Sequence, residues 1–217
     1  MSGAGEVSPG AWAALVAGGL AVQLLAEWRG WRWLRALAKG LSSAGFVGLA
    51  LALGATRDPY GRWILAGLLL SLVGDLLLLL NTRRALFLGL GAFLLAHLAY
   101  LAAFWVRGLA PVWTLIALAV LTVPRWKVLH WLLPAIDGPG MRRAVTLYAS
   151  VITLMLAAAA GTAAAWPGWR ILTGALLFYL SDLFVARQRF VAPGLTNRLI
   201  GLPLYYAGQV LLAWSAV

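Results

Sequence analysis

The sequence predicts an all-α polytopic membrane protein, with eight transmembrane helices in one domain that spans residues 1–217. Hydrophobic residues make up 63% of the chain and charged residues 11%, whereas soluble domains carry about 45–50% and about 25%. The apolar residues fall into eight runs close to the length of roughly 17–25 residues that spans a bilayer. The predicted helices cover residues 11–27, 36–56, 62–81, 85–106, 109–124, 143–165, 169–186 and 198–217.

Each run has its own support along the chain. The first follows an N-terminal stretch without the positive charges of a secretory signal, so we expect it to be retained. The second begins within the basic, aromatic segment WRGWRWLRALAK, which we expect to lie along the membrane interface before the helix turns inward. The third, fourth, sixth, seventh and eighth runs each have an arginine at or next to at least one end. The fifth, which ends at Pro124, is the shortest, and it could be tilted little or extend further.

The distribution of positive charge predicts the topology. Thirteen of the 17 Lys and Arg residues fall in the connections between runs one and two, three and four, five and six, and seven and eight. That asymmetry predicts that these connections face the cytoplasm and that both termini lie outside, in a bacterial inner membrane. The net charge of +11 therefore indicates orientation and contact with lipid headgroups rather than nucleic-acid binding.

Two aspartates, Asp75 and Asp182, lie inside apolar runs in matching positions. Each follows a glycine eight residues earlier, Gly67 or Gly174. A charged side chain at the bilayer centre costs about 2.5–3.5 kcal/mol, so both are candidates for a functional site. We expect the small residues beside them to bring the third and seventh helices together. The matching motifs also suggest a weak parallel 4+4 repeat.

Other polar side chains should lie in the same half of the membrane as the aspartates, judged from the rise of a helix. These candidate positioning residues are Lys39, His97, Tyr100, Tyr148, Ser181, Tyr205 and Gln209. Simpler alternatives exist, since Lys39 could extend to the headgroups and His97 could bond to a backbone carbonyl. Ser181 could likewise bond to its own helix.

A pair of buried carboxyls can serve more than one function. Two carboxyls in one poorly solvated cavity repel each other, so one would keep a proton while the other is ionised beside Lys39. This arrangement suits acid-catalysed cleavage through an oxocarbenium ion. It suits a proton-coupled transporter or lipid flippase equally well. A buried salt-bridge network with only a structural role is the third alternative.

The order of several short motifs resembles the YhhN family of eight-helix membrane proteins, which includes the lysoplasmalogenases. The motifs, from Lys39 to Gln209, are Lys39, SLVGD at 71–75, GAFLLAHLAY at 91–100, Tyr148, SD at 181–182 and YYAGQ at 205–209. Residue 40 is glycine, where we expect proline in the family.

The resemblance implies hydrolysis of the vinyl-ether bond of a lysoplasmalogen, without a metal or other cofactor. The products would be a fatty aldehyde and a glycerophospho-headgroup compound. Asp182 would be the acid and Asp75 the base, although the sequence does not settle their order. Tyr148, Tyr205 and His97 would position water or the ether oxygen. The arginines expected at the height of the lipid phosphate are Arg83, Arg84 and Arg187. The partners would be a lysophospholipid and the bilayer, and the sequence does not indicate an oligomeric state.

Overall fold

The computed structural model describes residues 7–80 and 82–216, and within these ranges it contains eight α-helices and no strand. The helices are α1 (Pro9–Arg29), α2 (Arg32–Ala52), α3 (Pro59–Leu79), α4 (Arg83–Arg107), α5 (Pro111–Leu132), α6 (Pro139–Ala165), α7 (Trp169–Ala186) and α8 (Leu195–Trp214). Two short segments, the 3₁₀-helix η1 (Leu133–Ala135) and the π-helix η2 (Arg187–Val191), follow α5 and α7. The predicted all-α membrane fold is confirmed, because α1 to α7 are long and apolar enough to cross a membrane.

The helix ends follow local sequence signals. Ser8, Asp58 and Thr82 each accept a hydrogen bond from a backbone N–H in the first turn of α1, α3 or α4, which satisfies an otherwise unpaired donor. Gly30 ends α1 with a φ of 74°, a left-handed conformation that glycine adopts without strain. The chain then enters α2 at Arg32 and continues to Ala52 as one helix. The basic, aromatic segment is therefore not a separate interfacial element.

Helix α5 is longer than expected, because it passes through Pro124 and ends at Leu132. Proline removes one backbone donor, but the remaining hydrogen bonds of a membrane helix stay intact around it. Arg125 consequently lies within the helix instead of in a connection.

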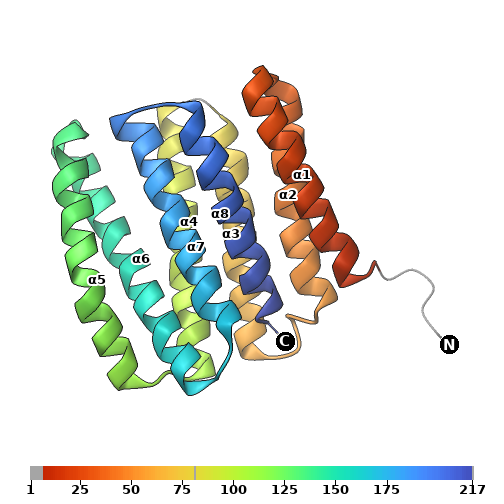
Figure 1. Cartoon of the computed structure of the whole chain (residues 1–217), viewed down its shortest axis with the longest axis vertical. Helices are drawn as coiled ribbons and strands as arrows, with labels where there is room; N and C mark the ends of the chain where they lie inside the picture. Colours follow the sequence, from red (N-terminus) through yellow and green to blue (C-terminus); the bar gives the residue numbers. More distant parts are fainter. Residues whose placement is uncertain (1–6, 81, 217) are drawn as a thin grey trace.

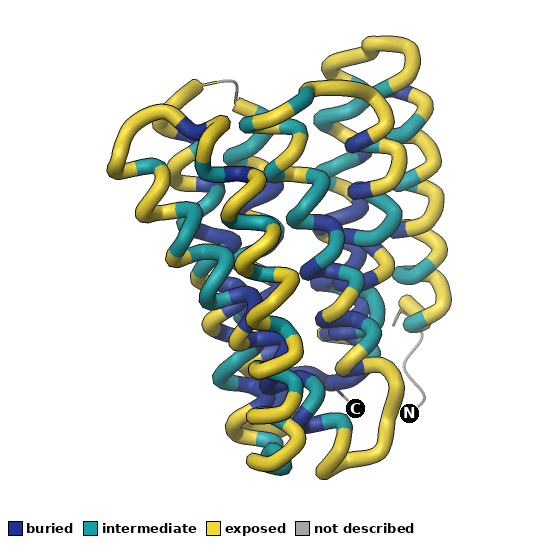
Figure 2. Tube along the Cα trace, turned by 60° about the vertical axis from the view of Figure 1, so that its left-hand side comes forward, coloured by how far each residue is buried: buried dark blue, intermediate teal, exposed yellow. Residues whose placement is uncertain are grey.

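Consecutive helices pack as antiparallel pairs, α1 with α2, α3 with α4, α5 with α6, and α7 with α8. The α3–α4 and α7–α8 pairs form the centre of the bundle, and the other two pairs flank it (Figure 1). Buried residues lie between the helices and exposed residues cover the outer faces (Figure 2). Helix α1 begins and α8 ends at one end of the bundle, and the positively charged connections lie at the other. The 4+4 repeat stays a prediction.

The glycines that precede the aspartates pack against the partner helix of each pair. A Cβ on Gly67 would overlap the ring of Tyr100 in α4, and one on Gly174 would lie 3.1 Å from the carbonyl oxygen of Gly208 in α8. A Cβ on Gly74 would likewise overlap the ring of Phe93 in α4. The expectation that Gly67 and Gly74 bring α3 and α7 together is therefore wrong. They bring each helix close to its antiparallel neighbour, because the chain connects those helices directly and small residues permit close backbone approach.

Candidate active site

A cavity of about 800 Å³ lies at the end of the bundle that carries the positively charged connections. Its wall includes residues from all eight helices, and both Asp75 and Asp182 line it. Much of its apolar lining comes from α4, α5 and α6, whereas α1, α2, α8 and η2 contribute most of its charged side chains. The space is therefore amphipathic, as a lipid-binding site should be.

Asp75 lies deep in the bundle and is held by three polar side chains. Its Oδ1 is 2.5 Å from Nζ of Lys39. Its Oδ2 accepts hydrogen bonds from the hydroxyls of Ser43, at 2.6 Å, and Tyr205, at 2.7 Å. Only 1% of Asp75 is exposed. An ammonium and two hydroxyl donors together stabilise the ionised form of this carboxyl.

Asp182 has fewer partners and is more open to the cavity. Its Oδ2 accepts a hydrogen bond of 2.7 Å from the hydroxyl of Tyr148. Nε2 of His97 lies 3.6 Å from the same oxygen and makes no hydrogen bond with the described residues. Nδ1 of His97 is 2.6 Å from the carbonyl oxygen of Phe93. Because a carbonyl only accepts, Nδ1 carries a proton, and Nε2 of the neutral ring is an acceptor.

Aromatic rings separate the two acidic clusters. The ring of Phe178 stacks on His97, with centroids 4.4 Å apart, and meets Tyr205 edge to face at 5.5 Å. Within the described residues no hydrogen bond joins the two carboxyls. Asp75 and Asp182 thus face one cavity from different surroundings, and each keeps its own set of partners.

Several predicted site residues lie away from the cavity wall. The hydroxyl of Tyr100 donates to Oε1 of Gln209 at 2.6 Å, and Nε2 of Gln209 donates to Ser71 at 3.2 Å. All three side chains are buried between α3, α4 and α8. Ser181 lines the cavity, but its hydroxyl donates to the carbonyl oxygen of Phe178 in its own helix.

The arginines expected near the lipid phosphate also lie outside the residues that line the cavity. Arg83 and Arg84 are exposed at the start of α4, and Arg187 donates to Oδ1 of Asn197 at 2.5 Å. Other arginines line the cavity instead. They are Arg32, Arg35, Arg125, Arg189 and Arg198.

Sequence reasoning missed Ser43 and Phe178. Ser43 carries a usable signal, because it follows Lys39 by four residues and therefore shares its helical face. Phe178 has no such signal, since a phenylalanine in an apolar helix is ordinarily a packing residue. In the described part of the chain, no three His, Cys, Asp or Glu side chains form a group that could hold a metal ion.

The fold and this cavity define a polytopic helical membrane protein with paired intramembrane carboxyls and a basic cavity mouth. The chain belongs to the YhhN family, which it matches over residues 34–216. It is 36% identical over 187 residues to the lysoplasmalogenase TMEM86B of Sus scrofa, an alignment that covers 84% of this chain and 75% of that protein.

Two further relatives carry the same description. The chain is 33% identical to the lysoplasmalogenase TMEM86A of Bos taurus, over 85% of this chain and 73% of that protein. It is 32% identical to the lysoplasmalogenase of Mycobacterium bovis, over 76% and 66%. No solved structure matches the chain.

Proposed function

We propose that this protein hydrolyses the vinyl-ether bond of lysoplasmalogens and releases a fatty aldehyde and a glycerophospho-headgroup compound. Membership of the YhhN family and the names of the relatives support this activity. The observation that carries the mechanism is the presence of two carboxyls with different partners on one amphipathic cavity. Carboxyl pairs in unlike surroundings divide the roles of acid and base in acid-catalysed cleavage.

Asp182 is the proton donor in this mechanism. The acceptor Nε2 of His97 lies 3.6 Å from Oδ2, so the buried histidine helps to hold a protonated Asp182 in place beside the cavity. Tyr148 donates to the same oxygen and holds the carboxyl in place. His97 and Tyr148 are thus positioning residues, and a general acid of this kind contributes about 10²–10⁴-fold to the rate.

Asp75 is the ionised partner. Lys39, Ser43 and Tyr205 stabilise its negative charge. A fixed anion beside the cavity stabilises a developing cation without reorganisation during the reaction. The same carboxylate accepts a proton from the attacking water.

The steps balance without a cofactor. Asp182 protonates the outer carbon of the double bond, and the positive charge forms on the carbon attached to the ether oxygen. Water adds to that carbon and gives a proton to Asp75, which yields a hemiacetal. The hemiacetal then collapses. Asp75 returns its proton to the departing ether oxygen, and the hydroxyl of the hemiacetal returns one to Asp182.

The membrane arrangement is part of the proposal. The positive-inside distribution supports an inner-membrane location with both termini outside and the cavity mouth facing the cytoplasm. A lysophospholipid of the inner leaflet could then enter with its headgroup at the mouth and its chain along the apolar wall.

The decisive experiment measures aldehyde release from lysoplasmalogen by the protein purified in detergent, where no ion gradient exists. We expect Asp75→Asn and Asp182→Asn each to abolish turnover while the protein stays folded. Asp137→Asn is the matched control, because Asp137 is exposed and lies outside the cavity wall. Lipid or proton movement in proteoliposomes without aldehyde formation would instead identify a transporter.

A further inference from the structure

The cavity mouth has more positive than negative charge. Arg35 lies 3.5 Å from Oε2 of Glu27, and Arg198 pairs with the same carboxylate oxygen. The side chain of Glu27 is buried, with 7% of its surface exposed. Arg32 and Arg189 also line the mouth, and neither forms an ion pair with a carboxylate in the part of the chain that the structure describes. Two of these four arginines therefore share one carboxylate, and among the described residues the other two pair with none.

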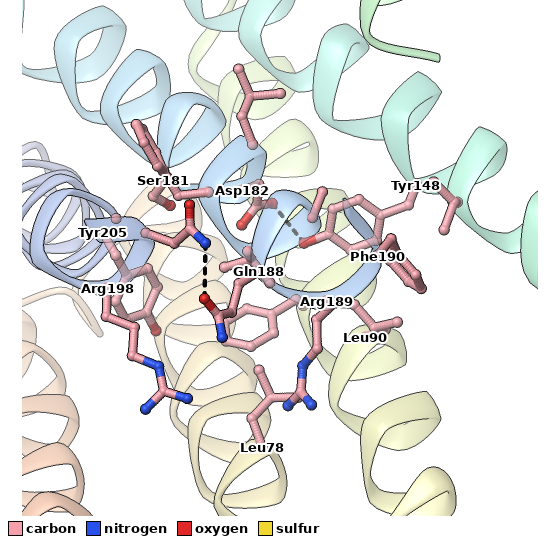
Figure 3. Close-up of a pocket in the computed structure, with 18 of the residues that line it drawn as sticks. Leu78, Leu90, Tyr148, Ser181, Asp182, Gln188, Arg189, Phe190, Arg198 and Tyr205 are labelled. Carbon is pink, nitrogen blue, oxygen red and sulfur yellow. Dashed lines mark hydrogen bonds between the residues drawn. The ribbon is translucent and has the colours of Figure 1, made fainter. Parts of the chain in front are cut away.

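Two of these arginines point the same way from separate elements. Arg189 belongs to η2 and Arg198 to α8, and their side chains extend on either side of Leu78 at the lower edge of the site (Figure 3). Hydrogen bonds hold the short connection between the two elements. Nδ2 of Asn197 donates to Oε1 of Gln188 at 2.9 Å and to the carbonyl oxygen of Ala192 at 2.8 Å.

Like charges repel one another when the backbone holds them close together, and an anion bound between them relieves that repulsion. Guanidinium groups match the geometry of phosphate oxygens, which they bind through paired hydrogen bonds. We propose that Arg35, Arg189 and Arg198 bind the phosphate of a lysophospholipid headgroup at the cavity mouth. Glu27 holds Arg35 and Arg198 in place when no phosphate is bound. This assignment rests on the proposed function and replaces the exposed arginines at the start of α4 as the phosphate site.

The spacing along the helices fits such a substrate. Arg35 precedes Lys39 by four residues, and Arg189 follows Asp182 by seven, so the Cα atoms of these arginines lie about 6–10 Å nearer the mouth along the helix axes. Five bonds separate phosphorus from the vinyl-ether oxygen of a lysoplasmalogen, a reach on the order of 6 Å. A phosphate bound at the mouth therefore brings the vinyl ether to the level of the two aspartates.

The test uses binding of a ligand that cannot be hydrolysed, so that it does not depend on turnover. A 1-alkyl lysophospholipid and the corresponding 1-alkylglycerol differ only in the phosphate headgroup. We expect the purified protein to bind the phosphate-bearing ether at least tenfold more tightly. Arg189→Ala and Arg198→Ala should each reduce that preference by about tenfold. Arg143→Ala is the matched control, because Arg143 is exposed and lies outside the cavity wall.

Turnover of lysoplasmalogen gives the corresponding kinetic result. Arg189→Ala should raise KM more than it lowers kcat, since the phosphate is held equally in the ground and transition states. Arg189 forms no ion pair with the described residues. Arg189→Ala therefore breaks no ion pair and should destabilise the fold less than Arg198→Ala does.

Three results would overturn the assignment. The first is an unchanged phosphate preference in both variants. The second is a loss of preference with Arg83→Ala or Arg84→Ala and none with Arg189→Ala or Arg198→Ala. The third is inorganic phosphate stabilising the protein against heat as strongly as the lysophospholipid does, which would identify a site for a free anion. Phosphate-dependent binding without aldehyde release would contradict only the proposed reaction.

Discussion

Replacing Lys39 with methionine tests the buried ion pair between Lys39 and Asp75. Methionine keeps the length and the apolar stem of lysine but removes the ammonium that lies 2.5 Å from Oδ1 of Asp75. The lysine side chain is 12% exposed and that of the aspartate 2%, so solvent compensates only poorly for the lost ammonium. Removing one member of a buried pair costs about 3–5 kcal/mol, because the other charge stays buried without compensation.

The hydroxyls of Ser43 and Tyr205 remain on Asp75 in this variant. They offset part of the loss, and the fall in unfolding free energy should therefore lie at the lower end, about 3 kcal/mol. We expect turnover to fall by about 10² or more, because the ammonium that holds the Asp75 carboxylate in place beside the cavity is lost. Unfolding in mixed detergent micelles and aldehyde release measure the two effects.

A double variant separates stability from catalysis. Lys39→Met combined with Asp75→Asn removes both charges, so most of the lost stability should return while activity stays absent. Lys127→Met is the control, since Lys127 is the only other lysine and is exposed. Wild-type stability and turnover in Lys39→Met, or no recovery of stability in the double variant, would refute the reasoning.

Two more substitutions probe the second acidic cluster and the helix packing. Tyr148→Phe removes the hydroxyl that donates to Asp182, and should lower kcat about tenfold with little change in KM and a loss of about 1 kcal/mol in stability. Steady-state kinetics with an unchanged kcat would contradict this. Gly67→Ala places a methyl group against the ring of Tyr100 and should cost about 1–3 kcal/mol. In Gly18→Ala, the Cβ meets nothing within 4 Å, so stability should hold or rise slightly. Equal melting temperatures for the two glycine variants would argue against the close packing of α3 on α4.

The helices and their order could be predicted from the sequence because a bilayer leaves the backbone few options. Each apolar run has to satisfy its own hydrogen bonds, and it does so as a helix. The end of α5 was predicted wrongly. The sequence placed it at Pro124, but the helix continues through this proline to Leu132. The convergence of Asp75 and Asp182 in depth could also be predicted, since depth follows from position along a helix.

Which side chains meet could not be predicted in the same way. Lys39 and Tyr205 meet at Asp75, whereas Tyr100 bonds to Gln209 outside the cavity wall. These contacts depend on how each helix is rotated about its axis and on which helices lie next to it. Both are set by packing between segments far apart in the chain.

The sequence by itself determined a helical membrane protein with two intramembrane carboxyls near its positively charged end. The length of each apolar run and the order of the charges determine positions along the membrane normal. Both can be read from the local sequence, without knowing which helices are neighbours. The tertiary structure alone decided that Arg35, Arg189 and Arg198, rather than Arg83 and Arg84, face the cavity. All five lie near the same membrane surface, and only lateral packing distinguishes the side of a helix that faces the cavity from the side that faces lipid or water.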